Sequence, residues 1–260
     1  EAIMSENITP RWITNIIHTC MGLKCGEKII FIMDEPLGHA RNALLTEAAK
    51  VNPSEIWSYT FPNAARPFSE YPPQLLTTAT QMDVVVLLLA SLDPVKEHPA
   101  LHAAVQTIIK SNARTGLGAF IDQSILDCEL SADYEQIAAF SSALAERLRG
   151  SSSARVTTAL GTDLRMSLVG REWRKDTGIL RGKNVFGNLP AGETYIAPIE
   201  DSAEGLLVVD KCFPGMLLSE PVRMRFENGR VTHIEGGAGA EFLEKAIAQH
   251  GDAARVIAEL

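Results

Sequence analysis

Few side chains in this sequence have the type and position to carry chemistry, and Glu193 is the first of them. The segment Phe186–Glu200, FGNLPAGETYIAPIE, contains a Pro- and Gly-containing loop that leads into a short apolar strand and presents Glu193 at the junction. A carboxylate fixed at the start of a strand suits a hard or borderline metal ion, or the terminal amine of a peptide. From the residues alone, an exposed loop carboxylate without such a role is the alternative.

A second candidate is the histidine pair His98 and His102, four residues apart. This spacing places two imidazoles on one face of a helix, as in zinc sites of the HExxH type. Here no glutamate lies between them, and Pro99 fits the first turn of a helix. We therefore expect His98 to begin a helix rather than to bind a metal.

Nucleophilic and phosphate-binding motifs are missing from the sequence. It contains no GxSxG, no GxGxxG and no Walker A motif, and the turn after the first expected strand begins with two acidic residues, Asp34 and Glu35. The four cysteines show neither a CxxC pair nor zinc-finger spacing, so we expect reduced thiols. We assign no catalytic residue. The cysteines are Cys20, Cys25, Cys128 and Cys212.

Composition limits the possible partners. The 260 residues are 46% hydrophobic and 22% charged, with 24 basic and 32 acidic side chains and a net charge of −8. Such a balance argues against nucleic acid as the main partner. The longest apolar run, Val84–Ala90, is shorter than the roughly 18 residues a membrane helix needs, and no signal peptide is visible. We expect a cytoplasmic protein without nucleic acid or membrane partners.

One basic stretch stands out in this acidic chain. Its side chains could contact an acidic peptide, or could form a solvated face that balances nearby acids. The stretch consists of Arg165, Arg171, Arg174, Lys175, Arg181 and Lys183.

Alternating helix and strand patterns must position these residues. Residues 1–150 show a βαβ alternation that predicts a Rossmann-like, doubly wound parallel sheet. After the small polar stretch 150–153, residues 151–260 show mostly alternating patterns, typical of a β-rich domain, with a two-residue hairpin turn at Asn228-Gly229. The expected strands are Lys28–Met33, Glu55–Phe61, Asp83–Leu89, Gly116–Ile121, Val156–Leu160, Leu164–Val169, Thr194–Pro198, Leu206–Asp210, Val222–Glu227 and Arg230–Glu235. The expected helices are Arg11–Met21, Leu37–Lys50, Leu75–Gln81, Pro99–Ser111, Ala132–Arg149, Glu241–His250 and Ala253–Leu260.

Several segments of the second half, in this order, resemble the aminopeptidase T/S family of metallopeptidases. The resemblance covers Val156–Leu260, while the first 150 residues match in architecture only. The segments are Gly161–Leu164, Gly178–Leu180, NLPAGETYIAP, Gly205–Asp210 and Asn228–Gly237.

The resemblance implies metal-ligand roles for two glutamates. Glu193, in the NLPAGE segment, and Glu259, in Ala258-Glu259-Leu260, match two ligands of the family's two-metal site, with zinc, cobalt or manganese as the metal. They lie 259 − 193 = 66 residues apart. The family's further ligands (histidines and an Asp) and its catalytic Tyr lie beyond the second glutamate. The chain thus looks like this fold ending before its metal site is complete, and we expect this chain to bind no metal.

The resemblance and the residues leave three functional hypotheses. The first is an aminopeptidase-like protein that binds a peptide without hydrolysing it, as a carrier for a peptide-modifying enzyme. The second is the N-terminal portion of an active two-metal aminopeptidase. The third is a relative of iron-dependent dioxygenases that open a dihydroxypyridine ring. Because full-length members of the family pair, we also expect a homodimer.

Overall fold

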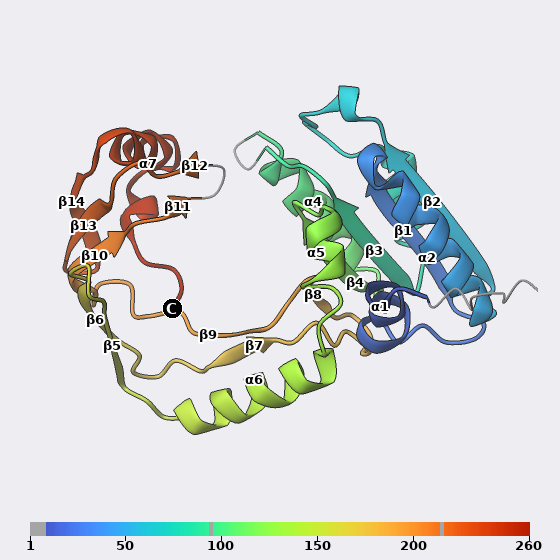
Figure 1. Cartoon of the computed structure of the whole chain (residues 1–260), viewed down its shortest axis with the longest axis horizontal. Helices are drawn as coiled ribbons and strands as arrows, with labels where there is room; N and C mark the ends of the chain where they lie inside the picture. Colours follow the sequence, from blue (N-terminus) through green and yellow to red (C-terminus); the bar gives the residue numbers. More distant parts are fainter. Residues whose placement is uncertain (1–8, 94–95, 214–215) are drawn as a thin grey trace, which may run out of the picture. The chain divides into compact units, whose positions relative to one another are not determined.

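The chain forms two compact units in the computed structural model, which describes residues 9–93, 96–213 and 216–260. The first unit contains Glu1–Ser141 and Asp176–Glu193, and the second contains Ser142–Lys175 and Thr194–Leu260 (Figure 1). The sequence placed a single boundary after residue 150. In the structure the chain returns to the first unit at residue 176, because a strand at 186–188 pairs with the parallel sheet there.

A five-stranded, fully parallel sheet organises the first unit, in the order β2-β1-β3-β4-β8. This arrangement confirms the doubly wound α/β architecture expected from the sequence. β8 was not expected, because three residues that include a glycine carry too little pattern to predict a strand. The strands are β1 (Lys28–Asp34), β2 (Glu55–Phe61), β3 (Val84–Leu89), β4 (Arg114–Ala119) and β8 (Phe186–Asn188).

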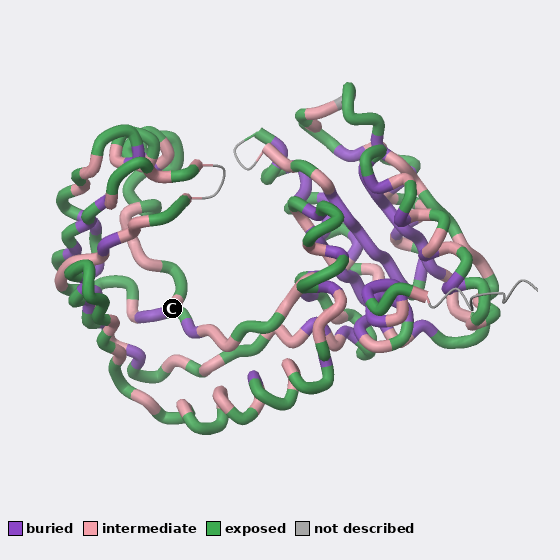
Figure 2. The backbone as a smooth tube through the Cα atoms, in the orientation of Figure 1, coloured by how far each residue is buried: buried purple, intermediate pink, exposed green. Residues whose placement is uncertain are grey.

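Helices cover both faces of this sheet because its central strands are apolar on both sides. Phe31 of β1 and Val86 of β3 pack into one core, whereas Ile32 and Leu87 pack into the other. Figure 2 shows these strands as the most continuously buried part of the unit. The first core is covered by α1 (Arg11–Thr14), a π-helical turn (Asn15–Cys20), α2 (Gly38–Lys50) and α5 (Gln123–Asp127). The second core is covered by α3 (Pro73–Ala79) and α4 (His98–Ile109).

The second unit is built on an antiparallel sheet in the order β14-β13-β10-β6-β5, which confirms a β-rich second part. Helix α7 packs on this sheet through Leu243 and Ile247. The Asn228-Gly229 turn is as predicted, since both residues have positive φ (50° and 77°). The strands are β5 (Ser153–Thr157), β6 (Asp163–Ser167), β10 (Glu204–Val209), β13 (Val222–Glu227) and β14 (Arg230–Glu235); the helices are α6 (Tyr134–Leu148), whose last turns belong here, and α7 (Gly237–His250).

Short elements complete the chain. Where a helix was expected over Ala253–Leu260, the structure has only a 3-10 turn, Asp252–Arg255, followed by extended chain. That extended segment is held by a bridge between Val256 and Arg230, and by two backbone hydrogen bonds between Leu260 and Ile196 (3.0 and 2.9 Å). The remaining elements are β7 (Arg174–Asp176), β9 (Glu193–Tyr195), β11 (Cys212–Phe213), β12 (Met216–Leu217) and 3-10 turns at Glu35–Leu37 and Asn63–Ala65.

Candidate ligand-binding site

The usual ligand position of a doubly wound sheet is closed here by the protein's own side chains. In this strand order, ligands bind beyond the carboxyl ends of the first and third strands, where the chain direction across the sheet reverses. Asp34, the last residue of β1, accepts hydrogen bonds from the backbone N–H groups of Ala90 (2.7 Å) and Ser91 (3.3 Å) just after β3. Its carboxylate therefore occupies the backbone donors that an anionic ligand would use.

Two further charged groups seal the same place. Arg66 donates to Asp34 and to both carboxylate oxygens of Glu97 (2.9 Å each), and Glu97 also accepts from the backbone N–H groups of Phe68 and Asp93 (2.7 Å each). Burial by itself lowers the pKa of Arg66, but the hydrogen bond to Asp34 and the two carboxylate charges raise it overall. Of the two acidic residues noticed in the sequence, Asp34 is thus part of a buried ion network, whereas Glu35 is exposed.

Glu193 lies at the end of the first unit, at the start of β9. It is exposed and lines a pocket of about 500 Å³ together with Glu129, Asn188 and Pro190. The loop before it passes very close to β4: a Cβ built on Gly118 would lie 2.3 Å from the carbonyl oxygen of Leu189. A glycine at that position of β4 is what admits the loop that positions Glu193.

Glu259 belongs to the second unit. It is exposed on the extended segment after the last 3-10 turn and lines a pocket of about 520 Å³, which we call the Tyr195 pocket. Arg171, Glu172, Arg174 and Tyr195 line the same pocket. The two backbone hydrogen bonds between Leu260 and Ile196 fix the segment beside this pocket.

A metal centre is not assembled by the side chains that the structure describes. No three His, Cys, Asp or Glu side chains form a metal-binding group in residues 9–93, 96–213 and 216–260. Glu193 and Glu259 fall in different units and in different pockets. His98 does begin a helix, α4, as expected, and its ring stacks on that of His102 (6.1 Å between centroids) on an exposed face. These side chains do not together form the two-metal site that the resemblance to aminopeptidase T/S implies.

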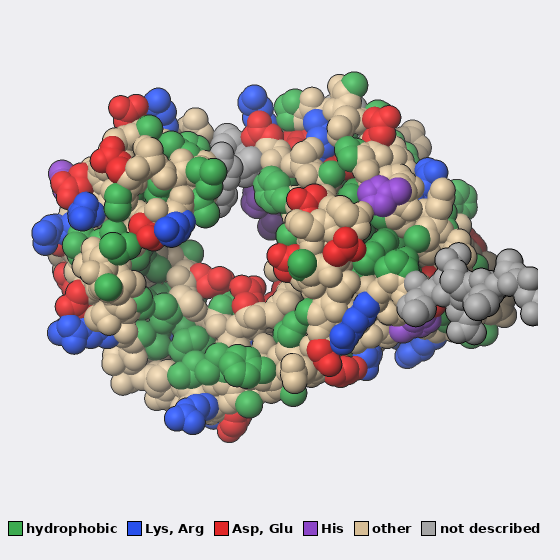
Figure 3. Space-filling model, in the orientation of Figure 1, with side chains coloured by type: hydrophobic (Ala, Val, Ile, Leu, Met, Phe, Trp, Pro, Cys, Tyr) green, Lys and Arg blue, Asp and Glu red, His purple; other side chains and the backbone are tan. Residues whose placement is uncertain are grey.

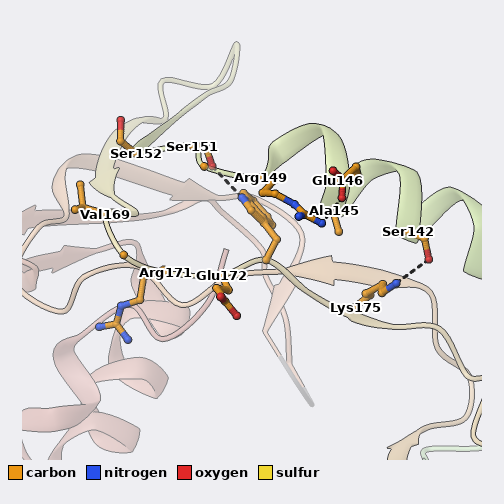
Figure 4. A pocket seen from close by; sticks show the side chains of 13 residues that line it. Ser142, Ala145, Glu146, Arg149, Ser151, Ser152, Val169, Arg171, Glu172 and Lys175 are labelled. Carbon is orange, nitrogen blue, oxygen red and sulfur yellow. Dashed lines mark hydrogen bonds and ion pairs between the residues drawn. The ribbon is translucent and has the colours of Figure 1, made fainter.

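The larger cavity in the second unit has a volume of about 720 Å³, and we call it the Trp173 pocket. It lies between the C-terminal turns of α6 and the segment 169–175, so sequence reasoning on separate motifs missed it. The last turns of α6 supply Ser142 and Glu146, the following turn and segment supply Arg149 and Ser151, and β7 supplies Lys175 (Figure 4). The volume is in the range of pockets that hold small molecules or a few peptide side chains.

Two hydrogen bonds preorganise the Trp173 pocket. The indole N–H of Trp173 donates to Ser151 Oγ (2.9 Å), which fixes the ring as one wall. The Lys175 ammonium donates to Ser142 Oγ (2.9 Å), drawn as a dashed line in Figure 4. Since Ser142 is neutral, this contact holds the ammonium in place without cancelling its charge.

The Trp173 and Tyr195 pockets adjoin, because Gly170, Arg171 and Glu172 line both. Arg171 is paired with Glu200 (2.6 Å), and Arg149 is paired with Glu146 in an exposed contact. Charges of both signs are interspersed on the molecular face shown in Figure 3, so no single sign dominates it. The basic stretch predicted from the sequence is divided: Arg181 belongs to the first unit, where it pairs with Glu135 (2.6 Å).

Together these features define a two-unit α/β protein. Its own side chains fill the usual ligand position at the carboxyl ends of β1 and β3, and its pockets lie beside Glu193, Tyr195 and Trp173. A model of the family NicX, 2,5-dihydroxypyridine 5,6-dioxygenase, matches residues 14–258. The match spans most of the chain, and the protein belongs to this family. The search of curated proteins found no match to this chain.

Two solved structures share the fold. One is the 2,5-dihydroxypyridine dioxygenase from Pseudomonas putida KT2440, at 18% identity and a TM-score of 0.71, covering 95% of this chain and 74% of that one. The other is wild-type AmpT from Thermus thermophilus, at 16% identity and a TM-score of 0.73, covering 96% and 76%. At such identities these likenesses concern the fold alone.

The family assignment corrects the resemblance drawn from the sequence. The aminopeptidase-like fold holds, as the similarity to AmpT shows, but the family is that of the dioxygenase, which the sequence placed third among its hypotheses. No helix among the residues that the structure describes is long and apolar enough to cross a lipid bilayer.

Proposed function

We propose that this protein binds an acidic peptide in its second unit without hydrolysing it. In this function it is a carrier that presents the peptide to a peptide-modifying enzyme. The observation that supports this function is the adjoining pair of pockets that share Gly170–Glu172. Two cavities that share one segment suit successive side chains of an extended ligand better than one small ring. Of the cations that line them, Arg149 and Arg171 are paired with Glu146 and Glu200, and Arg174 and Lys175 are the ones that favour carboxylates.

Calorimetric titration with an octapeptide of alternating Glu and Val tests this proposal. We expect saturable binding that persists with EDTA and weakens as salt is added, because surface charge attraction is screened. The matched control is an octapeptide of alternating Lys and Val, which should not bind. Glu193→Ala should change the affinity by no more than a few-fold. Loss of binding together with loss of a bound metal in that variant would contradict the proposal.

The second candidate function is the ring-opening reaction that gives the family its description. The match over residues 14–258 favours it. In this case the protein would need ferrous iron and dioxygen, and would bind peptides no more tightly than an unrelated protein does. Loss of 2,5-dihydroxypyridine absorbance, measured with and without ferrous iron in air and under argon, distinguishes the two. Turnover that requires both would displace the carrier function.

The oligomeric state belongs to the same proposal. We propose a homodimer, which light scattering coupled to gel filtration would detect as a mass of twice the 28.2 kDa of this chain.

A further inference from the structure

Strand β5 has one edge without a pairing strand. It is the last strand of the antiparallel sheet and pairs with β6 alone in the part of the chain that the structure describes. The opposite edge of the sheet, β14, is partly covered because Arg230 bridges to Val256. An open edge presents unpaired backbone donors and acceptors that can accept another strand.

The register of β5 shows which backbone groups face outward. Leu168 N donates to Ser152 O (2.9 Å) and Thr158 N to Thr162 O (3.1 Å), and both pairs continue the β5–β6 register. In an antiparallel pair, residues alternate between bonding the partner strand and pointing away from it. Residues 152, 154, 156 and 158 therefore face β6, and the N–H and C=O groups of Ser153, Arg155 and Thr157 point to the open edge.

The open edge continues directly into the Trp173 pocket. Ser151 and Ser152 line that pocket, and β5 begins at the next residue, Ser153. A strand added to β5 would therefore reach the pocket at one end. There it would meet the Lys175 ammonium, which donates to the neutral Ser142 hydroxyl, and the fixed Trp173 ring.

Charge favours an acidic occupant over a second copy of this chain. Arg155, in the middle of β5, is half exposed, but its charge is balanced by an ion pair with Asp163 (2.7 Å), and that of Arg149 is balanced by Glu146. Among the described residues, the Lys175 ammonium at the pocket end of the edge has a neutral hydroxyl as its partner rather than a carboxylate. A glutamate of an added peptide would meet this ammonium, whereas a second copy paired antiparallel about Arg155 would bring residues 157–160 there, which include no carboxylate.

We propose that an extended acidic peptide adds to the open edge of β5 as a sixth strand and places one carboxylate in the Trp173 pocket, beside Lys175. This inference rests on the proposed peptide-binding function and supplies its site.

The backbone contact is tested with a matched pair of variants, Arg155→Pro and Arg155→Ala. Both remove the exposed ion pair with Asp163, but only proline removes the outward N–H, and proline is tolerated in edge strands. With the Glu–Val octapeptide labelled with fluorescein, anisotropy should show affinity reduced about tenfold or more by Arg155→Pro, as for a lost hydrogen bond of about 1.4 kcal/mol, and by less than about threefold by Arg155→Ala. If the two variants reduced the affinity for the peptide equally, the proposal of an added strand would be overturned.

The pocket contact is tested by a double-mutant cycle that does not depend on the fold of the proline variant. Lys175→Gln should weaken the Glu–Val peptide about tenfold, and should have little effect on peptides in which the carboxylate that reaches the pocket is replaced by Gln. Each Glu is replaced in turn, so that one position alone should couple to Lys175.

The outcomes separate this inference from the proposed function. If neither Arg155→Pro nor Lys175→Gln changed the affinity for the peptide, the peptide-binding function would stand and the site at β5 would be refuted. Absence of binding of the Glu–Val peptide to the unaltered protein would refute both. A change of oligomeric state in Arg155→Pro, seen by light scattering, would identify the occupant of the edge as a second copy and overturn the peptide.

Discussion

Replacing Arg66 by Met should strongly destabilise the first unit. The Arg66 side chain is 10% exposed, and those of Asp34 and Glu97 are 1% exposed. Removing the guanidinium leaves two carboxylates buried near each other, each still bound to backbone N–H groups but without a cation. Breaking a buried ion pair from one side typically costs about 3–5 kcal/mol.

The size of this effect can be converted into a melting temperature. At about 2–4 °C per kcal/mol for a protein of this size, the loss corresponds to a decrease of roughly 10 °C. Thermal unfolding followed by circular dichroism at pH 7 measures it. The triple variant Arg66→Met, Asp34→Asn, Glu97→Gln should recover at least half of the loss, because no charge is then left unpaired.

The matched control is Arg41→Met, in the same unit. Arg41 is half-buried, but its guanidinium makes only one described hydrogen bond, to Thr60 Oγ1 at 3.3 Å. We expect the melting temperature of the Arg41→Met variant to fall by no more than about 3 °C, as for the loss of a single weak hydrogen bond. If Arg66→Met melted within about 2 °C of Arg41→Met, the network would not stabilise the fold as argued here.

Two further predictions concern titratable groups. Burial raises the pKa of Glu27, but the hydrogen bonds and charge of Arg114 lower it overall, below its ordinary value of 4.5, so its stabilising effect is present above that pH and is lost as the pH falls through the folded-state pKa. Urea unfolding of Glu27→Gln should therefore show a loss of about 2 kcal/mol at pH 7 that shrinks below about pH 4.5; a constant loss down to pH 3 would contradict this assignment. Burial raises the pKa of Cys20 to about 12, and the other three cysteines are exposed. An aromatic disulfide reagent should modify three thiols in the native protein and the fourth only after unfolding, whereas rapid modification of all four would show that Cys20 is accessible.

Much of the fold follows from local patterns in the sequence. The runs at Lys28–Met33 and Asp83–Leu89 are apolar at successive positions, and this alone indicates strands buried on both faces, as β1 and β3 are. The Asn228-Gly229 turn is likewise local, because it depends on two residues that accept positive φ.

The features that were missed depend on residues distant in the sequence. β8 forms because Thr115, Gly116 and Leu117 of β4 offer it a partner. The chain after Arg255 is extended because Arg230 pairs with Val256 and Ile196 with Leu260. Helical composition in that last segment was overruled by these pairings. The Trp173 pocket is also non-local, since its walls come from α6 and β7, and neither contains a motif.

The three-residue strand β8 has a consequence for how the protein is made. The chain leaves the first unit after residue 141 and supplies β8 only on its return, so a ribosome must synthesise the intervening part of the second unit before the parallel sheet is complete. Until then β4 is an exposed edge that other nascent chains can join. A polypeptide cut at residue 150, where the composition changes, would keep that edge exposed permanently, and aggregation during expression would be its expected fate.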